Sequence, residues 1–224
     1  MKTEDEKVAI LQFELLKWFS QYGRSFLWRE KGLSDYQYII AEVLLQRTRA
    51  ETISKFYPSF ISTFPSWYSL ASARLEDIEE SLRPIGLYRQ RAARLQKLAN
   101  EMVSRKGILP KNRSELEAIS FMGQYIANAV EQIIFGQPTP LLDVNMARVI
   151  ERVFEPRKLA DIRYDPHLQQ LSLKVIQHPL SLHLNWAILD FAALICTARI
   201  PKCLVCPINS ICLYYKELSK EGKD

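Results

Sequence analysis

The four cysteines of the chain restrict its fold more than any other feature, because all of them lie within one short segment near the C-terminal end. They are Cys196, Cys203, Cys206 and Cys212, with the spacing C-x6-C-x2-C-x5-C. Four thiolates in one irregular loop match the ligands of a [4Fe-4S] cluster, whereas structural Zn²⁺ more often uses two separated C-x2-C pairs. Two disulfides are a third interpretation, disfavoured because residues 1–20 show no secretory signal sequence. We therefore expect a [4Fe-4S] cluster, with zinc as the alternative.

Composition indicates a folded protein outside the membrane. The chain has 224 residues, of which 48% are apolar, so it can bury one large core or two small ones. No apolar run approaches the roughly 20 residues that cross a bilayer. Thirty Lys and Arg against 25 Asp and Glu leave a net charge of +5, which permits an anionic partner without requiring one. The absence of targeting signals leads us to expect a cytoplasmic, nucleoid-associated protein.

The spacing of apolar residues predicts an all-α protein. Apolar side chains recur at intervals of three and four residues, and apolar–polar alternation is rare. Turns are expected where Gly23, Pro65, Pro84–Gly86 and Gly107 interrupt this pattern. The predicted helices cover residues 4–22, 36–48, 50–64, 66–73, 75–83, 89–105, 144–154, 166–177 and 180–194.

A helix-hairpin-helix is predicted in the middle of the chain. Ser114 and Glu117 have the spacing of a capping box that opens a short helix ending near Ile119, and a second helix is expected over Tyr125–Phe135. The backbone N–H groups of such a hairpin can hold a phosphate without reading a base. Taken alone, the turn between the helices is better explained by a plain α-hairpin packed on the core.

Asp143 stands immediately before the predicted helix at 144–154. An aspartate at this position is a common helix N-cap, and that structural role is the alternative to a catalytic one.

These features together resemble the endonuclease III (HhH-GPD) superfamily of DNA glycosylases. The resemblance covers nearly the whole chain and is most specific in four segments. Within the superfamily the chain is most similar to the mismatch-specific thymine/uracil glycosylases, and next to the adenine (MutY-type) glycosylases. The four segments are 41–48 (AEVLLQRT), 85–92 (IGLYRQRA), 142–149 (LDVNMARV) and the cysteine run 196–212.

The resemblance implies two helical domains that flank a DNA-binding cleft. A six-helix barrel with the helix-hairpin-helix would span residues 32–137. A discontinuous [4Fe-4S] cluster domain would join residues 1–31 to residues 138–224. The expected partner is double-stranded DNA containing a mismatched or damaged base, and the protein is expected to act as a monomer.

Three catalytic residues follow from the resemblance. Asp143 matches the family's catalytic aspartate, which stabilises positive charge on the deoxyribose as the base leaves. Glu42 matches a glutamate that protonates the departing purine in adenine enzymes and would position the base or water in thymine enzymes. Tyr125 occupies the position of the Schiff-base lysine of bifunctional relatives, so a monofunctional enzyme that leaves an abasic site is expected.

The resemblance also implies DNA contacts. Arg47 and Leu87 stand where the family inserts side chains into the space left by the flipped nucleotide. Gly123 and Gln124 lie in the hairpin, and Arg199 and Lys202 lie in the cysteine loop, where they could contact phosphates. Ordinary core packing for Leu87 and solvated surfaces for the charged residues are the alternatives.

Two departures from the family pattern bear on function. The hairpin usually reads Leu-Pro-Gly-Val-Gly, whereas this chain has Ile119–Gly123 as Ile-Ser-Phe-Met-Gly, so the phosphate contact is expected to be weaker. The chain also ends soon after Cys212, without the C-terminal domain that adenine glycosylases use to sense oxidised guanine, which favours thymine or uracil. A DNA-damage-binding module without turnover and a cluster-based electron carrier are the alternatives from other functional classes.

Overall fold

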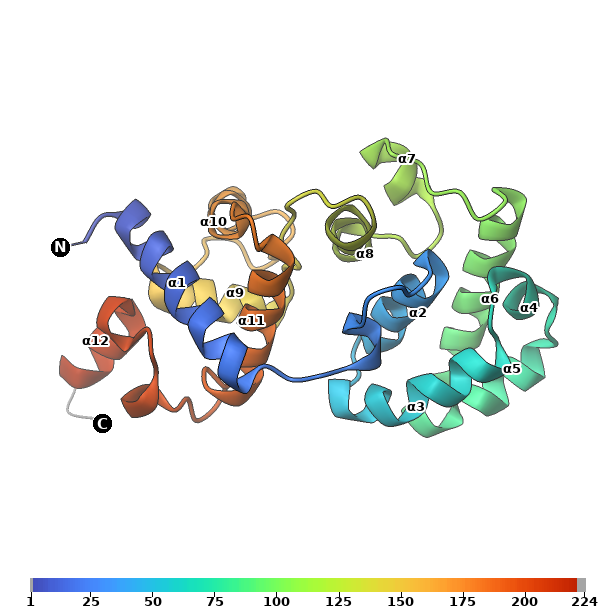
Figure 1. The fold of residues 1–224 in the computed structure, drawn as a ribbon, viewed down its shortest axis with the longest axis horizontal. Coiled ribbons are helices and arrows are strands. Elements are labelled where there is room, and N and C mark those ends of the chain that lie inside the picture. Colours follow the sequence, from blue (N-terminus) through green and yellow to red (C-terminus); the bar gives the residue numbers. More distant parts are fainter. Residues whose placement is uncertain (1, 221–224) are drawn as a thin grey trace. The chain divides into compact units, whose positions relative to one another are not determined.

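The computed structural model describes residues 2–220, and within that range its regular structure is entirely helical (Figure 1). The all-α prediction is therefore confirmed. No described helix is both long and apolar enough to span a bilayer. The α-helices are α1 (Glu4–Tyr22), α2 (Asp35–Leu45), α3 (Ala50–Thr63), α4 (Trp67–Ser72), α5 (Leu75–Leu82), α6 (Tyr88–Ser104), α7 (Arg113–Ala118), α8 (Gln124–Ala129), α9 (Val144–Val153), α10 (Pro166–Ile176), α11 (Ser181–Leu194) and α12 (Leu213–Lys220). Short 3-10 turns are η1 (Leu27–Arg29), η2 (Arg83–Ile85), η4 (Cys203–Val205) and η5 (Asn209–Ile211), and η3 (Val130–Ile134) is a π-helical turn.

Local sequence signals fix both ends of α1. Thr3 and Glu6 form a capping box at its start, where each side chain accepts a hydrogen bond from the other residue's backbone N–H. The helix stops at Gly23, whose N–H donates to the Phe19 carbonyl at 2.8 Å. A Cβ at position 23 would lie 2.6 Å from that carbonyl oxygen, so only glycine fits there.

The chain divides into two compact units. The terminal unit joins the segment that ends at Arg24 to the segment that begins at Glu131, and the middle unit is Ser25–Val130. In the terminal unit α1 packs against α11, and α9 packs against both α10 and α11. The core between these helices is aliphatic and aromatic, with Leu11, Leu15, Ile150, Ile188 and Phe191 fully buried. The barrel and cluster-domain assignments stay predictions.

The middle unit is organised around α6, against which α4 and α5 pack. α2 packs against α3 and α8. Aromatic contacts reinforce this core: the rings of Tyr36 and Trp67 meet edge to face with centroids 4.8 Å apart. The helices α2 and α6, and the loop that follows α2, therefore all belong to the packed structure of the middle unit.

The predicted capping box of the hairpin is wrong. α7 begins two residues earlier than that box implies, and its N-cap is Asn112, whose side-chain oxygen accepts from the N–H groups of Ser114 (3.0 Å) and Glu115 (3.2 Å). Ser114 therefore lies inside the helix, and Glu117 pairs with Arg113 instead of returning to the cap. An Asn at the N-cap competes well with Ser, so the local spacing alone did not identify the true cap.

Two predicted helices differ from the structure, one in its end and one in its regularity. The helix predicted over residues 36–48 ends at Leu45, because Arg47 takes up a left-handed backbone with φ of 58°. The helix predicted over Tyr125–Phe135 consists of α8 followed by the π-helical turn η3. Such turns add one residue to a helical turn, which the apolar pattern of a sequence does not reveal.

Candidate active site

Asp143 lies at the N-cap of α9 in the terminal unit, with both carboxylate oxygens engaged. Oδ1 accepts from the backbone N–H groups of Asn145 (2.9 Å) and Met146 (2.8 Å). Oδ2 accepts from the side-chain amide of Asn145 at 2.6 Å. The capping role is thus real, and it holds the carboxylate in one orientation on a rigid helix.

A chain of side-chain contacts connects Asp143 to the cysteine loop. The Asn145 side-chain oxygen accepts from both terminal nitrogens of Arg148 at 3.2 Å. Arg148 in turn donates from Nε to the Cys196 carbonyl at 2.9 Å and from Nη2 to the Ala192 carbonyl at 3.0 Å. The same guanidinium therefore contacts a neighbour of the aspartate and the backbone of the first cysteine.

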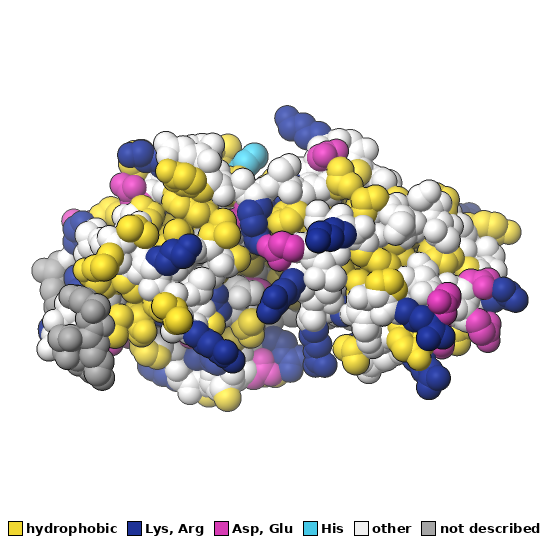
Figure 2. Space-filling model, turned by 90° about the horizontal axis from the view of Figure 1, so that it is seen from below, with side chains coloured by type: hydrophobic (Ala, Val, Ile, Leu, Met, Phe, Trp, Pro, Cys, Tyr) yellow, Lys and Arg dark blue, Asp and Glu magenta, His cyan; other side chains and the backbone are white. Residues whose placement is uncertain are grey.

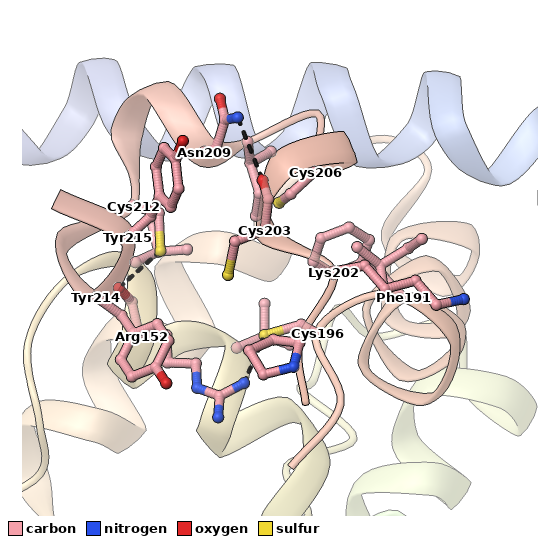
Figure 3. A pocket seen from close by; sticks show the side chains of 15 residues that line it. Arg152, Phe191, Cys196, Lys202, Cys203, Cys206, Asn209, Cys212, Tyr214 and Tyr215 are labelled. Carbon is pink, nitrogen blue, oxygen red and sulfur yellow. Dashed lines mark hydrogen bonds between the residues drawn. The ribbon is translucent and has the colours of Figure 1, made fainter. Parts of the chain in front are cut away.

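The four cysteines line one pocket of the terminal unit, with an empty volume of about 360 Å³ that includes open solvent. Figure 3 shows their sulfur atoms turned toward a shared space, with Arg152 beside Cys196. Arg152 Nη1 lies 3.3 Å from Cys196 Sγ, and the Cys212 thiol donates to the Arg152 carbonyl at 3.1 Å. The guanidinium of Arg152 also stacks over the Tyr214 ring at 4.5 Å.

Burial raises the pKa of Cys206 to about 12, with further contributions from the neighbouring cysteines, and it raises the pKa of Cys212 in the same direction. Within residues 2–220, no group of three or more His, Cys, Asp or Glu side chains is arranged to hold a single metal ion. The arrangement is one of four thiols around a common space, with Cys212 buried and the other three half-buried.

Glu42 and Tyr125 belong to the middle unit, on the helices α2 and α8 that pack against each other. Glu42 is 7% exposed, a low value for a carboxylate. Buried carboxylates are held by partners or have chemical roles. Tyr125 is half-buried in the first turn of α8.

Arg47 and Leu87 line the same pocket of the middle unit. This pocket has an empty volume of about 610 Å³, open solvent included, and its lining also contains Gln46, Gln90, Arg91 and Arg94. Both Arg47 and Leu87 have left-handed backbones, with φ of 58° and 52°. Leu87 is 55% exposed, so it is not a core residue.

The hairpin keeps a tight turn despite its altered sequence. Phe121, at the position of the family's first glycine, has φ of 66°, and the guanidinium of Arg94 lies 5.3 Å from its ring centroid. The Ser120 N–H, which a proline would lack, donates to Glu101 Oε2 at 3.0 Å. Burial alone would raise the pKa of Glu101, but hydrogen bonds from Ser120 and Arg105 outweigh it and lower that pKa. Gly123 is the exposed N-cap of α8, and Gln124 is half-buried at its first position.

Arg199 and Lys202 are exposed in the cysteine loop. On the face shown in Figure 2, basic side chains are interspersed with hydrophobic ones. The DNA contacts of Arg199 and Lys202 stay a prediction.

The sequence did not predict a role for four residues that make structural contacts at these sites: Asn145, Arg148, Arg91 and Glu101. Each contacts a partner through its side chain, and most of those partners are distant along the chain. The available signal was position: Asn145 and Arg148 lie in the conspicuous segment 142–149, and Arg91 lies in 85–92. The polar residues of these segments could therefore have been proposed as supporting residues from the sequence.

Comparisons with known proteins identify the family of the chain. The family model described as "HhH-GPD superfamily base excision DNA repair protein" matches residues 40–173. A thymine/uracil-DNA glycosylase of Pyrobaculum aerophilum is 35% identical over 209 residues, which cover 91% of this chain and 90% of that protein. An adenine DNA glycosylase of Homo sapiens is 29% identical over 231 residues, covering 96% of this chain but 41% of that protein. The solved structure of a thermostable thymine-DNA glycosylase superposes with a TM-score of 0.87 at 28% identity, covering 94% of this chain and 97% of that one.

Proposed function

Since the chain belongs to the HhH-GPD superfamily of base excision DNA repair proteins, we propose that it is a monofunctional DNA glycosylase that removes thymine or uracil mispaired with guanine. The observation that carries this proposal is the combination of a rigidly oriented Asp143 with similarity to thymine/uracil glycosylases over nearly the full length of both chains. The product would be an abasic site in an unbroken strand. DNA containing the mispair is the substrate.

Asp143 is assigned the stabilisation of the positive charge that develops on the deoxyribose as the base departs. Its two oxygens are fixed by the first turn of α9 and by the Asn145 amide, so little reorganisation is needed when charge appears. A preorganised carboxylate is more effective than a mobile one for this reason. The same carboxylate can orient the attacking water.

Glu42 and Tyr125 are assigned to the base. Low exposure favours Glu42 as a group that acts on a desolvated ligand, either by holding the base and water or by donating a proton. Tyr125 would line the base pocket. Because a tyrosine cannot form a Schiff base with the sugar, no strand cleavage by β-elimination is expected.

The residues of the cysteine loop fit a [4Fe-4S] cluster as its four ligands. Four cysteine sulfurs around one pocket supply the donor set that such a cluster takes, and Cys196, Cys203, Cys206 and Cys212 would hold it. When bound, the cluster would supply four thiolate–iron bonds that order the loop carrying Arg199 and Lys202. Those two exposed side chains would then contact phosphates of the DNA backbone.

Metal content tests the cluster directly. Protein purified without oxygen is expected to contain about four iron and four sulfide per chain, with broad visible absorption. One zinc per chain would instead assign the loop to a structural zinc site. Four freely alkylated thiols and no metal would remove both assignments.

An excision assay tests the activity. Matched duplexes carrying T:G, U:G, A:G, A:oxidised-G and T:A pairs are incubated with the protein, with and without alkali afterwards. We expect alkali-dependent cleavage at T:G and U:G, and Asp143→Asn should lower the rate more than about 100-fold while DNA binding persists. Cleavage confined to adenine would indicate the adenine glycosylase activity instead, with Glu42 as the general acid. A complete lack of excision with retained binding would support a damage-binding module.

A further inference from the structure

Arg91 makes an unusual set of contacts for a half-buried arginine on the surface of α6. Its terminal nitrogens donate to three acceptors, one in the last turn of α2 and two in the loop after it: the Leu44 carbonyl at 3.2 Å, the Gln46 carbonyl at 2.8 Å and the Thr48 hydroxyl at 2.7 Å. Two of these acceptors belong to the residues immediately before and after Arg47. The guanidinium therefore holds both chain neighbours of Arg47.

This contact is needed because the backbone of Arg47 is strained. A non-glycine residue with φ of 58° is in a less favourable conformation than an ordinary one, because its Cβ crowds the backbone. Such a conformation persists only where the surroundings favour it strongly. The loop's own backbone bonds are few, Gln46 N–H to Val43 O at 3.4 Å and Thr48 N–H to Leu45 O at 3.1 Å, so Arg91 supplies much of the restraint.

The same arginine connects Arg47 to Leu87. Leu87 is the N-cap of α6, and its carbonyl accepts from the Arg91 N–H at 2.9 Å in the first helical turn. Arg47 and Leu87 both line the pocket and both have left-handed backbones. Arg91 connects them, because it contacts Leu87 through a backbone hydrogen bond of the helix and the neighbours of Arg47 through its guanidinium.

The charge of Arg91 is not stabilised by a salt bridge within this pocket. The pocket lining contains Arg47, Arg91 and Arg94 and no acidic residue. Burial, followed by repulsion from Arg94 and Arg47, lowers the pKa of Arg91. The Nε of Arg91 is buried without a hydrogen-bond partner. Burial and the neighbouring arginines disfavour the charge of Arg91 at this position. We therefore look for its role in the hydrogen bonds that it donates to backbone carbonyls.

We propose that Arg91 is a positioning residue that holds the Gln46–Thr48 loop, and with it Arg47, in the conformation required for excision. This inference rests on the proposed function for its catalytic consequence, since Arg47 would enter the space left by the flipped nucleotide. Arg91 itself is not assigned any contact with the DNA. Loss of Arg91 should therefore release the loop and slow a step that depends on Arg47, while leaving general DNA binding close to normal.

The test compares Arg91→Met with Lys97→Met, Arg91→Lys and Thr48→Val. Lys97 is an exposed residue of the same helix, so Lys97→Met removes the same charge without touching the loop. Thr48→Val removes one acceptor from the other side of the contact and guards against a folding defect in the Arg91 variants. Arg91→Lys keeps the charge but not the planar fork.

Two readouts are needed, and only one depends on turnover. Hydrogen exchange of the peptide spanning residues 43–50 should be at least about 10-fold faster in Arg91→Met than in Lys97→Met, with Thr48→Val intermediate. Single-turnover excision should fall about 10- to 100-fold in Arg91→Met, with affinity for undamaged duplex within about three-fold of the control. Arg91→Lys should recover part of both effects.

The outcomes separate the two proposals. Equal exchange rates in Arg91→Met and Lys97→Met would overturn the positioning role, whether or not the protein is a glycosylase. Equal excision rates in these two variants, in the presence of normal wild-type excision, would also overturn it. If the wild-type protein excises no base, the proposed function fails, and faster exchange in Arg91→Met would still support Arg91 as the anchor of the loop.

Discussion

The side-chain amide of Asn145 donates to Oδ2 of Asp143 at 2.6 Å, two residues along the chain from the carboxylate that it orients. The other end of the same amide accepts from Arg148, which reaches the Cys196 carbonyl. Asn145 thus contacts both the aspartate and the arginine. The orientation of Asp143 and the position of the cysteine loop share one connecting side chain.

Replacement of Asn145 should lower excision without removing DNA binding. In Asn145→Ala, Oδ2 of Asp143 loses its side-chain donor while Oδ1 keeps the two backbone donors. We expect a fall of about 10- to 100-fold in the single-turnover rate, because the carboxylate becomes free to rotate. An unchanged rate, measured together with a normal melting temperature, would show that the two backbone bonds alone orient Asp143.

Phe121 provides a test of backbone strain in the hairpin. Glycine is usually less stable than alanine at an ordered position, but φ of 66° reverses this preference. Phe121→Gly should therefore be more stable than Phe121→Ala by about 1 kcal/mol. Urea unfolding of the two variants compares them directly, since both lose the ring and its contact with Arg94. Equal midpoints would indicate that the turn rearranges when the ring is removed.

The contact between Glu101 and Ser120 should make stability depend on pH in the acid range. Because the folded protein lowers the pKa of Glu101 from 4.5, this carboxylate contributes stability that is fully present above about pH 4.5 and is lost as the pH falls through the folded value. The free-energy difference between the wild type and Glu101→Gln should shrink as the pH is lowered from 6 to 3. A constant difference over that range would mean that ionised Glu101 is not the preferred acceptor for Ser120.

Asp190 should be among the most sensitive residues of the terminal unit. It is fully buried in α11, and its carboxylate accepts from the Arg24 backbone N–H at 2.7 Å and from Arg24 Nε at 2.9 Å. Asp190→Ala should destabilise the protein by about 3–5 kcal/mol, because it leaves the arginine without its buried counter-ion. Thermal unfolding beside the exposed control Asp161→Ala provides the comparison, since Asp161 pairs with Arg163 at the surface. Similar losses in both variants would contradict a special role for the buried pair.

Much of the fold followed from short-range sequence signals. The predicted bounds of α1 agree with the structure, because Thr3, Glu6 and Gly23 act on their immediate neighbours. The start of α9 after Asp143 and of α10 at Pro166 were likewise predicted, since N-caps and first-turn prolines are local features. The cap of α7 was predicted wrongly at Ser114, because asparagine and serine both cap well and the spacing to Glu117 does not identify Asn112 as the true N-cap.

The supporting contacts of the candidate site were beyond prediction for a different reason. Arg91 and the carbonyl of Gln46 are 45 residues apart, and Arg148 and the carbonyl of Cys196 are 48 apart. Backbone carbonyls carry no sequence signature, so an arginine that binds them looks the same as one that faces solvent. Motif resemblance could suggest Asp143, Arg47 and Leu87, but not the residues that hold them.

The division of the chain into one continuous and one discontinuous unit has a consequence for its synthesis. The middle unit is complete once residue 130 has left the ribosome, whereas α1 must wait for α11, its main packing partner, to be translated. Until then the apolar face of α1, with Leu11 and Leu15, has no native surface to cover it. The cysteine loop is made later still, after α11 has been translated. Truncation by a premature stop before α11 would accordingly leave α1 as an exposed, aggregation-prone helix next to a middle unit whose own sequence is intact.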